Sequence, residues 1–494
     1  MRLVEIRDLD GPNVFLLKPA IKIELALDGA SIAAVQAIEP IICDLHRQAG
    51  AALPDVIVVP METPGHAVLA FSWQHRRLAL GVAEAAVRIA TGDNPDLNSV
   101  AERLREIYAT FEEDDAPLLV RDAERRTRAI AVTGTNGKTT TTRLIAHIAR
   151  LAGWRVGWSS STGVYIAGTE VLQGDYSGPS GARRVLTEPG LDLAVLETAR
   201  GGILLRGLAY ESTDVSVFTN VSGDHLGHLG VYTVEELARV KSVVVRVTRP
   251  EGFAVLNADD PLVLAQRNVI RARPFLVSQD AGNPAIAAHV AGGGHALVVS
   301  GGDLVLLHSD TRTVLMPVSD IPITFGGRAR PMVENALCGA AACIAIGLDR
   351  DAVRRGLGSF RNSTDQNPGR LNVFRVGDVT VIVDFAHNEA GLSSLIDFAR
   401  TFARPNGRLI SVIGTAGDRT DASLRAIGRI AAERSDVVIV KGTKKYLRGR
   451  QPEELIELYL QGVRSAGDRA DGAARVDARA RLGKARRCRC HHGA

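Results

Sequence analysis

The sequence predicts an α/β protein: an N-terminal α/β domain, a central domain built on a parallel sheet, and a smaller Rossmann-like C-terminal domain. Three observations predict this class. Short apolar runs alternate with segments of helical periodicity, as strands and helices do in α/β proteins. Several runs end in polar, glycine-rich segments, which is typical of parallel strands at the edge where a sheet binds ligands. A second series of strand and helix patterns begins near Asn362.

These patterns divide the chain of 494 residues into three expected domains. The N-terminal domain covers residues 1–115, and the acidic run at residues 112–115 is expected to be a linker. The central domain covers residues 126–361. The C-terminal domain covers residues 362–494, and its tail from about residue 475 is atypical because it is rich in arginine and poor in apolar residues.

The N-terminal domain is expected to contain several strands and a helix. Residues 75–91 place apolar side chains at helical spacing along one face, and residues 10–13 have the composition of a turn. No catalytic pattern is present in this part of the sequence. The expected strands are residues 14–17, 21–25, 56–59 and 67–71.

The stretch from Ala129 to Arg150 carries the strongest functional pattern. An apolar strand at residues 129–132 runs into a glycine turn and then into a helix with apolar positions at Leu144 and Ile148. Backbone N–H groups of such a turn can point inward, and the helix dipole favours an anion there. The expected phosphate cradle consists of Gly134, Thr135, Asn136, Gly137, Lys138, Thr139 and Thr140.

This cradle predicts ATP binding. Lys138 is expected to reach the β- and γ-phosphates, and the Thr139 hydroxyl is expected to hold Mg²⁺. Val132 stands where the commonest form of the motif has its first glycine. The alternative is an ordinary glycine turn between a strand and a helix, but strand, turn, Lys-Thr pair and helix all occur in the right order.

Two further strands of the central domain end in candidate metal ligands. Glu197 follows the apolar strand at residues 193–196, and a carboxylate at a strand end can bind Mg²⁺ or cap the next helix. His225 follows the strand at residues 214–220, and it is interpreted as a metal ligand or as a structural histidine. Lys241 lies in an expected helix at residues 234–247, where spacing alone predicts a solvent-exposed lysine.

The rest of the chain continues the alternation of strand and helix patterns. Residues 274–325 show short β runs separated by glycine pairs, which predicts a small antiparallel insertion. The further expected strands are residues 155–158, 254–257, 379–384, 408–414 and 436–440, and the further expected helices are residues 333–347, 351–358, 390–402 and 424–434.

Composition narrows the class of protein. Hydrophobic residues make up 46% and charged residues 23% of the chain, as in globular proteins. The formal net charge of +4 is too small to favour nucleic-acid binding. No apolar run approaches the roughly 20 residues of a membrane span, and residues 1–5 do not begin a signal peptide. The expected location is therefore the cytoplasm, with no membrane and no nucleic-acid partner.

The tail from about residue 475 allows two interpretations. It is either a basic arm for an acidic partner or a truncated or frame-shifted end, and its composition favours the second because a closing strand is missing. Cys488, Cys490, His491 and His492 could suggest a metal site, but their spacing is too tight for an ordinary zinc site.

Several motifs taken in order resemble the Mur ligase family. They are TGTNGKTTT, ETARGGILLRGL, TNVSGDHLG, ARVKSVV, VLNADDP, NPGR, DFAHN and GTAGDR. More narrowly, they are similar to the Mur-type half of the cyanophycin synthetases, and the opening of the chain also looks like the start of those enzymes. In that group an ATP-grasp domain separates the N-terminal domain from the Mur-type half. Here the two follow each other almost directly, so the ATP-grasp domain is expected to be absent.

The resemblance implies roles for individual residues. Glu197 and His225 match magnesium ligands, and Lys241 matches a lysine that is carbamylated in many Mur ligases. Asn335 matches an adenine contact, although Pro331 and Met332 replace the usual His-Asn pair before it. The remaining matches are Arg370 and Asp384 for nucleotide contacts from the hinge and the C-terminal domain, and His387 and Asn388 for the DxAHN loop.

The resemblance also implies the reaction. A substrate carboxylate would attack the γ-phosphate of ATP, and an amine would then displace phosphate from the acyl phosphate, with Mg²⁺ as the metal. The first candidate for the amine is arginine, and the acceptor would be an acidic peptide or small molecule. A homo-oligomer is expected. The alternatives are a stand-alone amino-acid ligase with another acceptor and a catalytically weak ATP-binding partner subunit.

Overall fold

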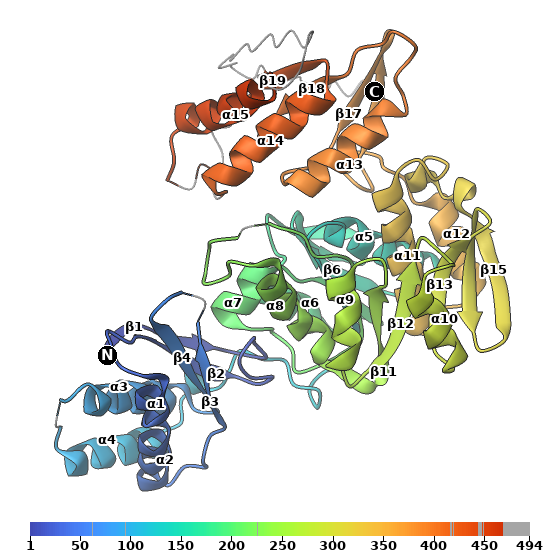
Figure 1. Cartoon of the computed structure of the whole chain (residues 1–494). Helices are drawn as coiled ribbons and strands as arrows, with labels where there is room; N and C mark the ends of the chain where they lie inside the picture. The colour runs from blue at the N-terminus through green and yellow to red at the C-terminus, as the bar shows by residue number, and fades with distance from the viewer. Residues whose placement is uncertain are drawn as a thin grey trace, which may run out of the picture. The chain divides into compact units, whose positions relative to one another are not determined.

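The computed structural model describes residues 1–467 except Glu62, Asn94, His225, Thr415, Ala416, Asp418, 443–446 and Arg448. This range forms two compact units (Figure 1). Unit 1 comprises Met1–Val221 and His228–Arg361, and unit 2 comprises Ser222–Gly227 and the described residues from Asn362 onward. The basic tail and its cysteine and histidine residues lie outside the described residues.

The N-terminal part of unit 1 is an antiparallel sheet with helices on one face. Its elements are β1 (Arg2–Leu9), β2 (Ala20–Ala26), α1 (Ile32–Gln36), α2 (Ile38–Ala49), β3 (Val56–Pro60), β4 (His66–Ser72), α3 (Arg76–Ala90) and α4 (Leu97–Ala109), with the strand order β1-β2-β4-β3. Ile23 of β2 and Leu69 of β4 share an apolar core with Ile42 of α2 and Val82 of α3. The helices lie on one side of the sheet (Figure 1).

The expected strand at residues 14–17 is wrong, because Asn13 folds this segment into a loop. The buried Asn13 side chain donates to the carbonyl oxygens of Gly11 and Lys18, both at 3.0 Å, and accepts from the backbone N–H groups of Phe15 and Leu16. These bonds occupy backbone groups that a strand would pair with its neighbour. β2 pairs instead with β1 on one side and with β4 on the other, and β1 was not among the predicted strands.

The expected linker at residues 112–115 is an ordered part of the N-terminal core. It contains the 3₁₀ helix η1 (Glu113–Asp115), and Asp115 is only 1% exposed. The Asp115 carboxylate accepts hydrogen bonds from the backbone and the guanidinium group of Arg77, and it lies 3.2 Å from Nδ1 of His75. Burial by itself would raise the pKa of Asp115, but the hydrogen bonds from Arg77 and Glu112 outweigh it and lower this pKa to about 2.

The central part of unit 1 is a sheet of eleven strands, parallel in its middle and antiparallel at both edges. The order is β15-β14-β13-β12-β11-β10-β5-β9-β6-β7-β8. The strands are β5 (Arg128–Thr133), β6 (Val156–Ser160), β7 (Gly163–Ile166), β8 (Thr169–Gln173), β9 (Leu193–Glu197), β10 (Thr213–Phe218), β11 (Thr248–Asn257), β12 (Arg273–Ser278), β13 (His295–Ser300), β14 (Asp303–His308) and β15 (Thr311–Pro317). Because β5 and β9 are buried along nearly their whole length, they carry almost continuous apolar residues.

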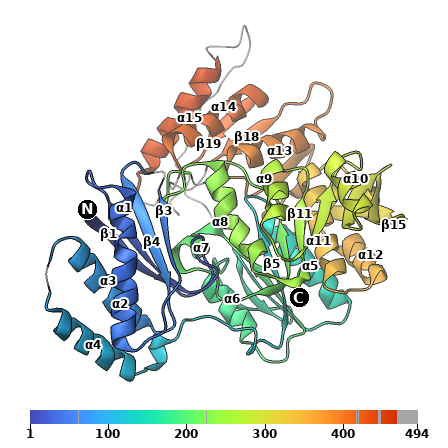
Figure 2. The same cartoon turned by 60° about the horizontal axis from the view of Figure 1, so that its bottom comes forward.

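Helices cover both faces of this sheet (Figure 2). One group consists of α5 (Lys138–Leu151), α11 (Arg330–Ala345) and α12 (Arg350–Ser359), which contact one another. The other group consists of α6 (Pro179–Leu186), α7 (Arg200–Arg206) and α8 (Val234–Arg246). Two short helices, α9 (Pro261–Leu264) and α10 (Pro284–Ala291), and the 3₁₀ helices η2 (Ala265–Asn268), η3 (Val318–Asp320) and η4 (Pro322–Thr324) complete this part.

The expected antiparallel insertion at residues 274–325 is only partly correct. β12 and β13 continue the parallel sheet, because α10 provides the crossover that a parallel connection needs. Only β14 and β15 are antiparallel, and they form the edge. The sequence patterns do show the alternating class of fold, and this mixed sheet with a parallel centre confirms it.

Unit 2 is a smaller α/β unit. Its elements are β16 (Asn372–Val376), β17 (Val379–Val383), α13 (Glu389–Arg400), β18 (Ile410–Ile413), α14 (Asp421–Arg434), β19 (Val437–Val440) and α15 (Pro452–Gly467). β18 and β19 are parallel, and their side chains share an apolar core with Leu424 and Tyr459. Within the described parts of both units, no helix combines the length and the apolarity needed to cross a membrane.

Candidate nucleotide-binding site

The turn between β5 and α5 requires glycine at two positions. Gly137 is the N-cap of α5 and has φ of 86°, and Gly134 has φ of 150°. A Cβ atom on Gly134 would lie 2.0 Å from Oγ1 of Thr219, and one on Gly137 would lie 2.1 Å from Oδ1 of Asn335. The turn can therefore pack this closely against Thr219 and Asn335 beside the helix N-terminus only because both positions lack a side chain.

Two lysine side chains donate hydrogen bonds to the carbonyl oxygen of Gly134, the first glycine of this turn. Nζ of Lys138 donates to the carbonyl oxygens of Gly134 and Thr135 at 3.0 and 2.8 Å, and Nζ of Lys241 donates to the carbonyl oxygen of Gly134 at 2.7 Å. Lys241 is only 4% exposed, so the expectation of a solvated lysine from spacing alone is wrong. Lys241 reaches the turn from α8, a contact between distant segments that sequence periodicity cannot reveal.

Glu197 lies at the end of β9, beside the first turn of α5. Its Oε1 accepts a hydrogen bond of 3.0 Å from the Thr139 hydroxyl, and its Oε2 accepts one of 3.0 Å from the backbone N–H of Ser161. The Ser161 hydroxyl lies 3.0 Å from that of Thr139. β5, β6 and β9 are neighbours in the sheet, which brings these three residues together. Ser161 was not among the predicted site residues, although it follows the expected strand at residues 155–158.

Asn220 and helix α11 hold the other side of the turn. The side chain of Asn220 bonds both the N–H and the carbonyl of Asn136, at 2.9 and 3.2 Å. Asn335 is buried, and its Oδ1 accepts from the Thr141 hydroxyl at 3.4 Å. Asn335 thus packs on the turn at Gly137. The hydrogen bonds of Asn220 to the turn were not predicted from the sequence.

The remaining candidate residues belong to unit 2 or lie outside the described residues. His225 is not described, and its neighbour Asp224 lies 3.2 Å from Nη2 of Arg419 and 3.5 Å from Nε2 of His387 within unit 2. Asp384 accepts from the backbone N–H of Leu371 at 2.8 Å, and burial raises the pKa of Asp384. Arg370 stacks over Phe385, and Asn388 caps α13 through Gly391.

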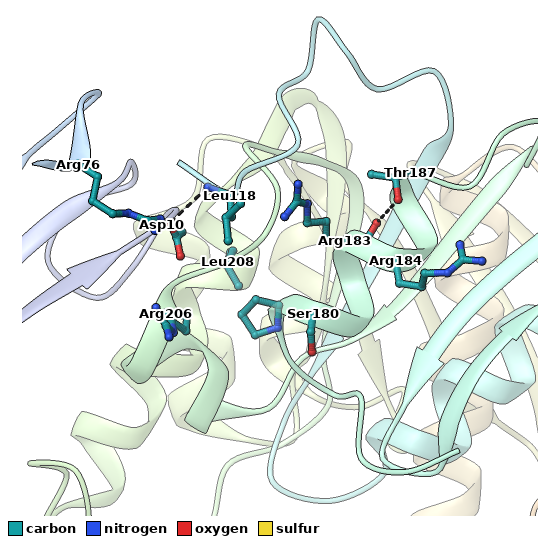
Figure 3. A pocket seen from close by; sticks show the side chains of 10 residues that line it. Asp10, Arg76, Leu118, Ser180, Arg183, Arg184, Thr187, Arg206 and Leu208 are labelled. Carbon is teal, nitrogen blue, oxygen red and sulfur yellow. Dashed lines mark hydrogen bonds and ion pairs between the residues drawn. The ribbon is translucent and has the colours of Figure 1, made fainter. Parts of the chain in front are cut away.

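A cavity in unit 1, separate from the glycine turn, is lined by several arginines (Figure 3). It has a volume of about 870 Å³, and its walls come from the N-terminal part and from helices α6 and α7. Arg76 is paired with Asp8 and Asp10, and Arg184 is paired with Glu188. The cavity is lined by Asp10, Arg76, Leu118, Pro179, Ser180, Arg183, Arg184, Thr187, Arg206 and Leu208.

Two arginines of this cavity are weakly neutralised. Arg183 has no carboxylate within ion-pair distance in the described part of the chain, and Arg206 lies 4.0 Å from Asp8. In the view of Figure 3 the guanidinium group of Arg183 points toward Leu118, whereas that of Arg184 points the other way. The backbone N–H of Ala199, two residues after Glu197, donates to the carbonyl oxygen of Ser177 just before α6. The cavity wall is therefore linked directly to the end of β9.

The mostly parallel sheet and the glycine turn before α5 define a P-loop nucleotide-binding protein. Residues 132–343 match the Mur ligase middle domain, and residues 369–485 match the Mur ligase, glutamate ligase domain. The chain belongs to the Mur ligase family, whose members are ATP-dependent amide-bond ligases.

Curated relatives support this assignment. The chain is 43% identical to the cyanophycin synthetase of Synechocystis sp. over 334 residues, which are 68% of this chain and 38% of that protein. It is 40% identical to the cyanophycin synthetase of Crocosphaera subtropica over 356 residues, 72% of this chain and 40% of that protein. The chain thus spans about two fifths of the length of these relatives.

A more distant relative and one solved structure agree with the fold. The UDP-N-acetylmuramoyl-L-alanyl-D-glutamate–2,6-diaminopimelate ligase of Geobacter metallireducens is 30% identical, with 70% of this chain and 65% of that protein aligned. The structure of E. coli FolC in complex with DHPP and ADP is similar with a TM-score of 0.50 at 22% identity, covering 72% of this chain and 85% of that one.

Proposed function

We propose that this protein is an ATP-dependent carboxylate–amine ligase that joins an amino acid to an acidic acceptor. The observation that carries the proposal is the arrangement around the cradle. Lys138, Lys241 and the Thr139–Glu197 pair lie around one turn at the N-terminus of α5. An anionic triphosphate fits this place because backbone N–H groups, the helix dipole and the ammonium group of Lys138 all favour negative charge there.

Mg²⁺ fits the donor set beside the cradle. Thr139, Ser161 and Glu197 offer two hydroxyls and a carboxylate within hydrogen-bond distance of one another, and hard oxygen donors are the ligands that Mg²⁺ prefers. His225 remains a proposed ligand from the family resemblance. When bound, Mg²⁺ would supply charge neutralisation at the transferred phosphoryl group.

The chemistry proceeds in two balanced steps. An oxygen of the acceptor carboxylate attacks the γ-phosphorus of ATP, the bond to the bridging oxygen breaks, and ADP leaves. The amine nitrogen then attacks the acyl carbon and loses its proton, and phosphate leaves with the former carboxylate oxygen. Lys138 neutralises charge that develops on the transferred group. Asn335, Arg370 and Asp384 are proposed to contact the nucleotide.

We propose that Lys241 is carbamylated in the active protein. Its Nζ already lies 2.7 Å from the carbonyl oxygen of Gly134, so a carbamate would stand directly beside the cradle. A carbamate replaces a cation with an anion that can bind Mg²⁺. Incubation with ¹³C-bicarbonate should give a carbamate NMR signal that the Lys241→Arg variant lacks, and equal signals from both proteins would contradict this assignment.

The arginine-lined cavity supports an acidic acceptor. Arg183 and Arg206 can bind carboxylates remote from the reacting one, because guanidinium groups pair with carboxylates in two-point geometry. Arginine is the first candidate for the amine. Arg183→Gln is expected to raise KM for an aspartate-rich peptide several-fold with little change in KM for ATP, and equal effects on both would contradict this role.

A stand-alone ligase with a single amide-forming site is favoured over a polymerase. The 3₁₀ helix η1 ends at Asp115 and β5 begins at Arg128, so only a short connection separates the N-terminal part from the cradle. Phosphate release measured with ATP, Mg²⁺, single amino acids and acidic peptides tests the proposed function. Release that requires both an amine and an acceptor supports it, whereas release that ignores both would indicate a simple nucleotidase.

A further inference from the structure

We infer that Glu334 is a positioning residue for the nucleotide cradle and that it acts through Asn220. Glu334 lies on α11, next to Asn335, and it belongs to none of the motifs that define the cradle. Nδ2 of Asn220 donates a hydrogen bond of 2.7 Å to Oε1 of Glu334. This inference rests on the proposed function, because it concerns the affinity of the same cradle for ATP.

Asn220 joins the cradle to the end of β10 through several bonds. Its Oδ1 accepts from the backbone N–H of Asn136 at 2.9 Å, and its Nδ2 donates to the carbonyl oxygen of Asn136 at 3.2 Å. Its backbone carbonyl accepts from the N–H of Thr135 at 2.8 Å. Asn220 therefore bonds two consecutive residues of the turn, Thr135 through its backbone and Asn136 through its side chain.

This pairing works only in one orientation of the Asn220 carboxamide. Rotation by half a turn would place its NH₂ group against the N–H of Asn136 and its oxygen against the carbonyl, so both contacts would become repulsive. Glu334 accepts a hydrogen bond from the NH₂ group, which the carboxamide oxygen could not donate. Its carboxyl thus selects the orientation that holds the cradle.

The groups around Glu334 explain why a buried hydrogen-bond acceptor is tolerated at this position. Burial raises the pKa of Glu334, the charges of Asp260 and Asp259 also raise it, and the hydrogen bond from Asn220 lowers it. The net result is a pKa of about 7. Asp260 is itself held by bonds from the N–H groups of Val221, Leu262 and Val263. A carboxyl that is neutral much of the time near pH 7 closely resembles a carboxamide, so glutamine should replace Glu334 well.

The experiment compares the affinity for a non-hydrolysable ATP analogue, measured by calorimetry with Mg²⁺, among the wild type, Glu334→Ala and Glu334→Gln. We expect Glu334→Ala to weaken binding roughly five- to tenfold, as expected for one lost hydrogen bond, and Glu334→Gln to stay within about twofold of the wild type. Glu251→Ala, an exposed glutamate on β11, is the matched control. Equal losses in the Ala and Gln variants would overturn the inference.

A double-mutant cycle tests whether Glu334 acts through Asn220. In an Asn220→Ala background, Glu334→Ala should cause no further loss of affinity. Additive losses would overturn the inference, because they would show a separate role for Glu334. Thermal unfolding of each variant separates weak binding from a damaged fold. Failure of the wild type to bind the analogue would instead contradict the proposed function, so the two failures are distinguishable.

Discussion

Nζ of Lys241 on α8 donates a hydrogen bond of 2.7 Å to the carbonyl oxygen of Gly134, the first glycine of the cradle. The two residues lie on different elements, and Lys241 is almost fully buried. The hydrogen bond connects the position of α8 to the shape of the glycine turn. The contact therefore makes α8 a structural support of the proposed cradle.

Replacement of Lys241 should disturb both stability and nucleotide binding. Lys241→Met keeps the length and apolar stem of the side chain but removes the donor, so the Gly134 carbonyl loses this partner. We expect the free energy of unfolding to fall by about 1–3 kcal/mol and the affinity for ATP to fall as well. Lys18→Met, at a side chain that is 52% exposed, is the control in thermal unfolding. Equal stability of the two variants would contradict this account.

Lys138→Ala should abolish ATP turnover without unfolding the protein. The ammonium group is bonded to two carbonyl oxygens of the turn, and it is the cation expected to meet the transferred phosphoryl group. Turnover should fall by at least roughly 10²-fold, the scale seen when one charge-stabilising group is removed. Phosphate release by Lys138→Ala at the wild-type rate would show that the cradle has been assigned to the wrong residues.

Asp115 should make the N-terminal part sensitive to acid. Its pKa is about 2 in the folded protein and 3.8 as the model-compound value, so the carboxylate stabilises the fold fully above about pH 4. This contribution, about 2 kcal/mol at most, is lost as pH falls from about 4 toward 2. Asp115→Asn should be less stable than the wild type at pH 7, and the difference should shrink below pH 4. A constant difference in stability between the two proteins across this pH range would exclude Asp115 as the source of the acid sensitivity.

The predicted strands and helices follow mainly from local sequence, and the errors have physical causes. β9 is recognisable because a strand buried on both faces is mostly apolar. The segment after Asn13 fails as a strand because one side chain captures its backbone donors. Asp115 looks like part of an acidic linker, since its partner Arg77 is distant in sequence.

The candidate site was predictable where its motif is continuous and not where it depends on packing. Residues 134–140 are consecutive, so turn chemistry alone identifies them. Three features depend on which strands and helices become neighbours in the fold. They are the burial of Lys241, the contact of Ser161 with Glu197, and the hydrogen bond from Asn220 to Glu334. No spacing rule contains that information.

A single cradle should support a single amide-forming step. The chain with ATP, Mg²⁺, labelled arginine, labelled aspartate and a short acidic primer should incorporate arginine without sustained incorporation of aspartate. Adding aspartate to a growing backbone needs activation of an α-carboxylate at another site. Sustained incorporation of labelled aspartate would show that the chain has a second activating site, and incorporation of neither label would point to another acceptor.

The most direct test of the proposed ligase chemistry follows the transfer of an oxygen atom from the acceptor carboxylate to phosphate. An acidic peptide with ¹⁸O in its carboxylates is incubated with ATP, Mg²⁺ and the amine, and the released phosphate is analysed by mass spectrometry. Attack of the carboxylate on the γ-phosphorus predicts one ¹⁸O atom in each phosphate, with none transferred by Lys138→Ala. Amide formation accompanied by unlabelled phosphate would contradict the proposed ligase chemistry.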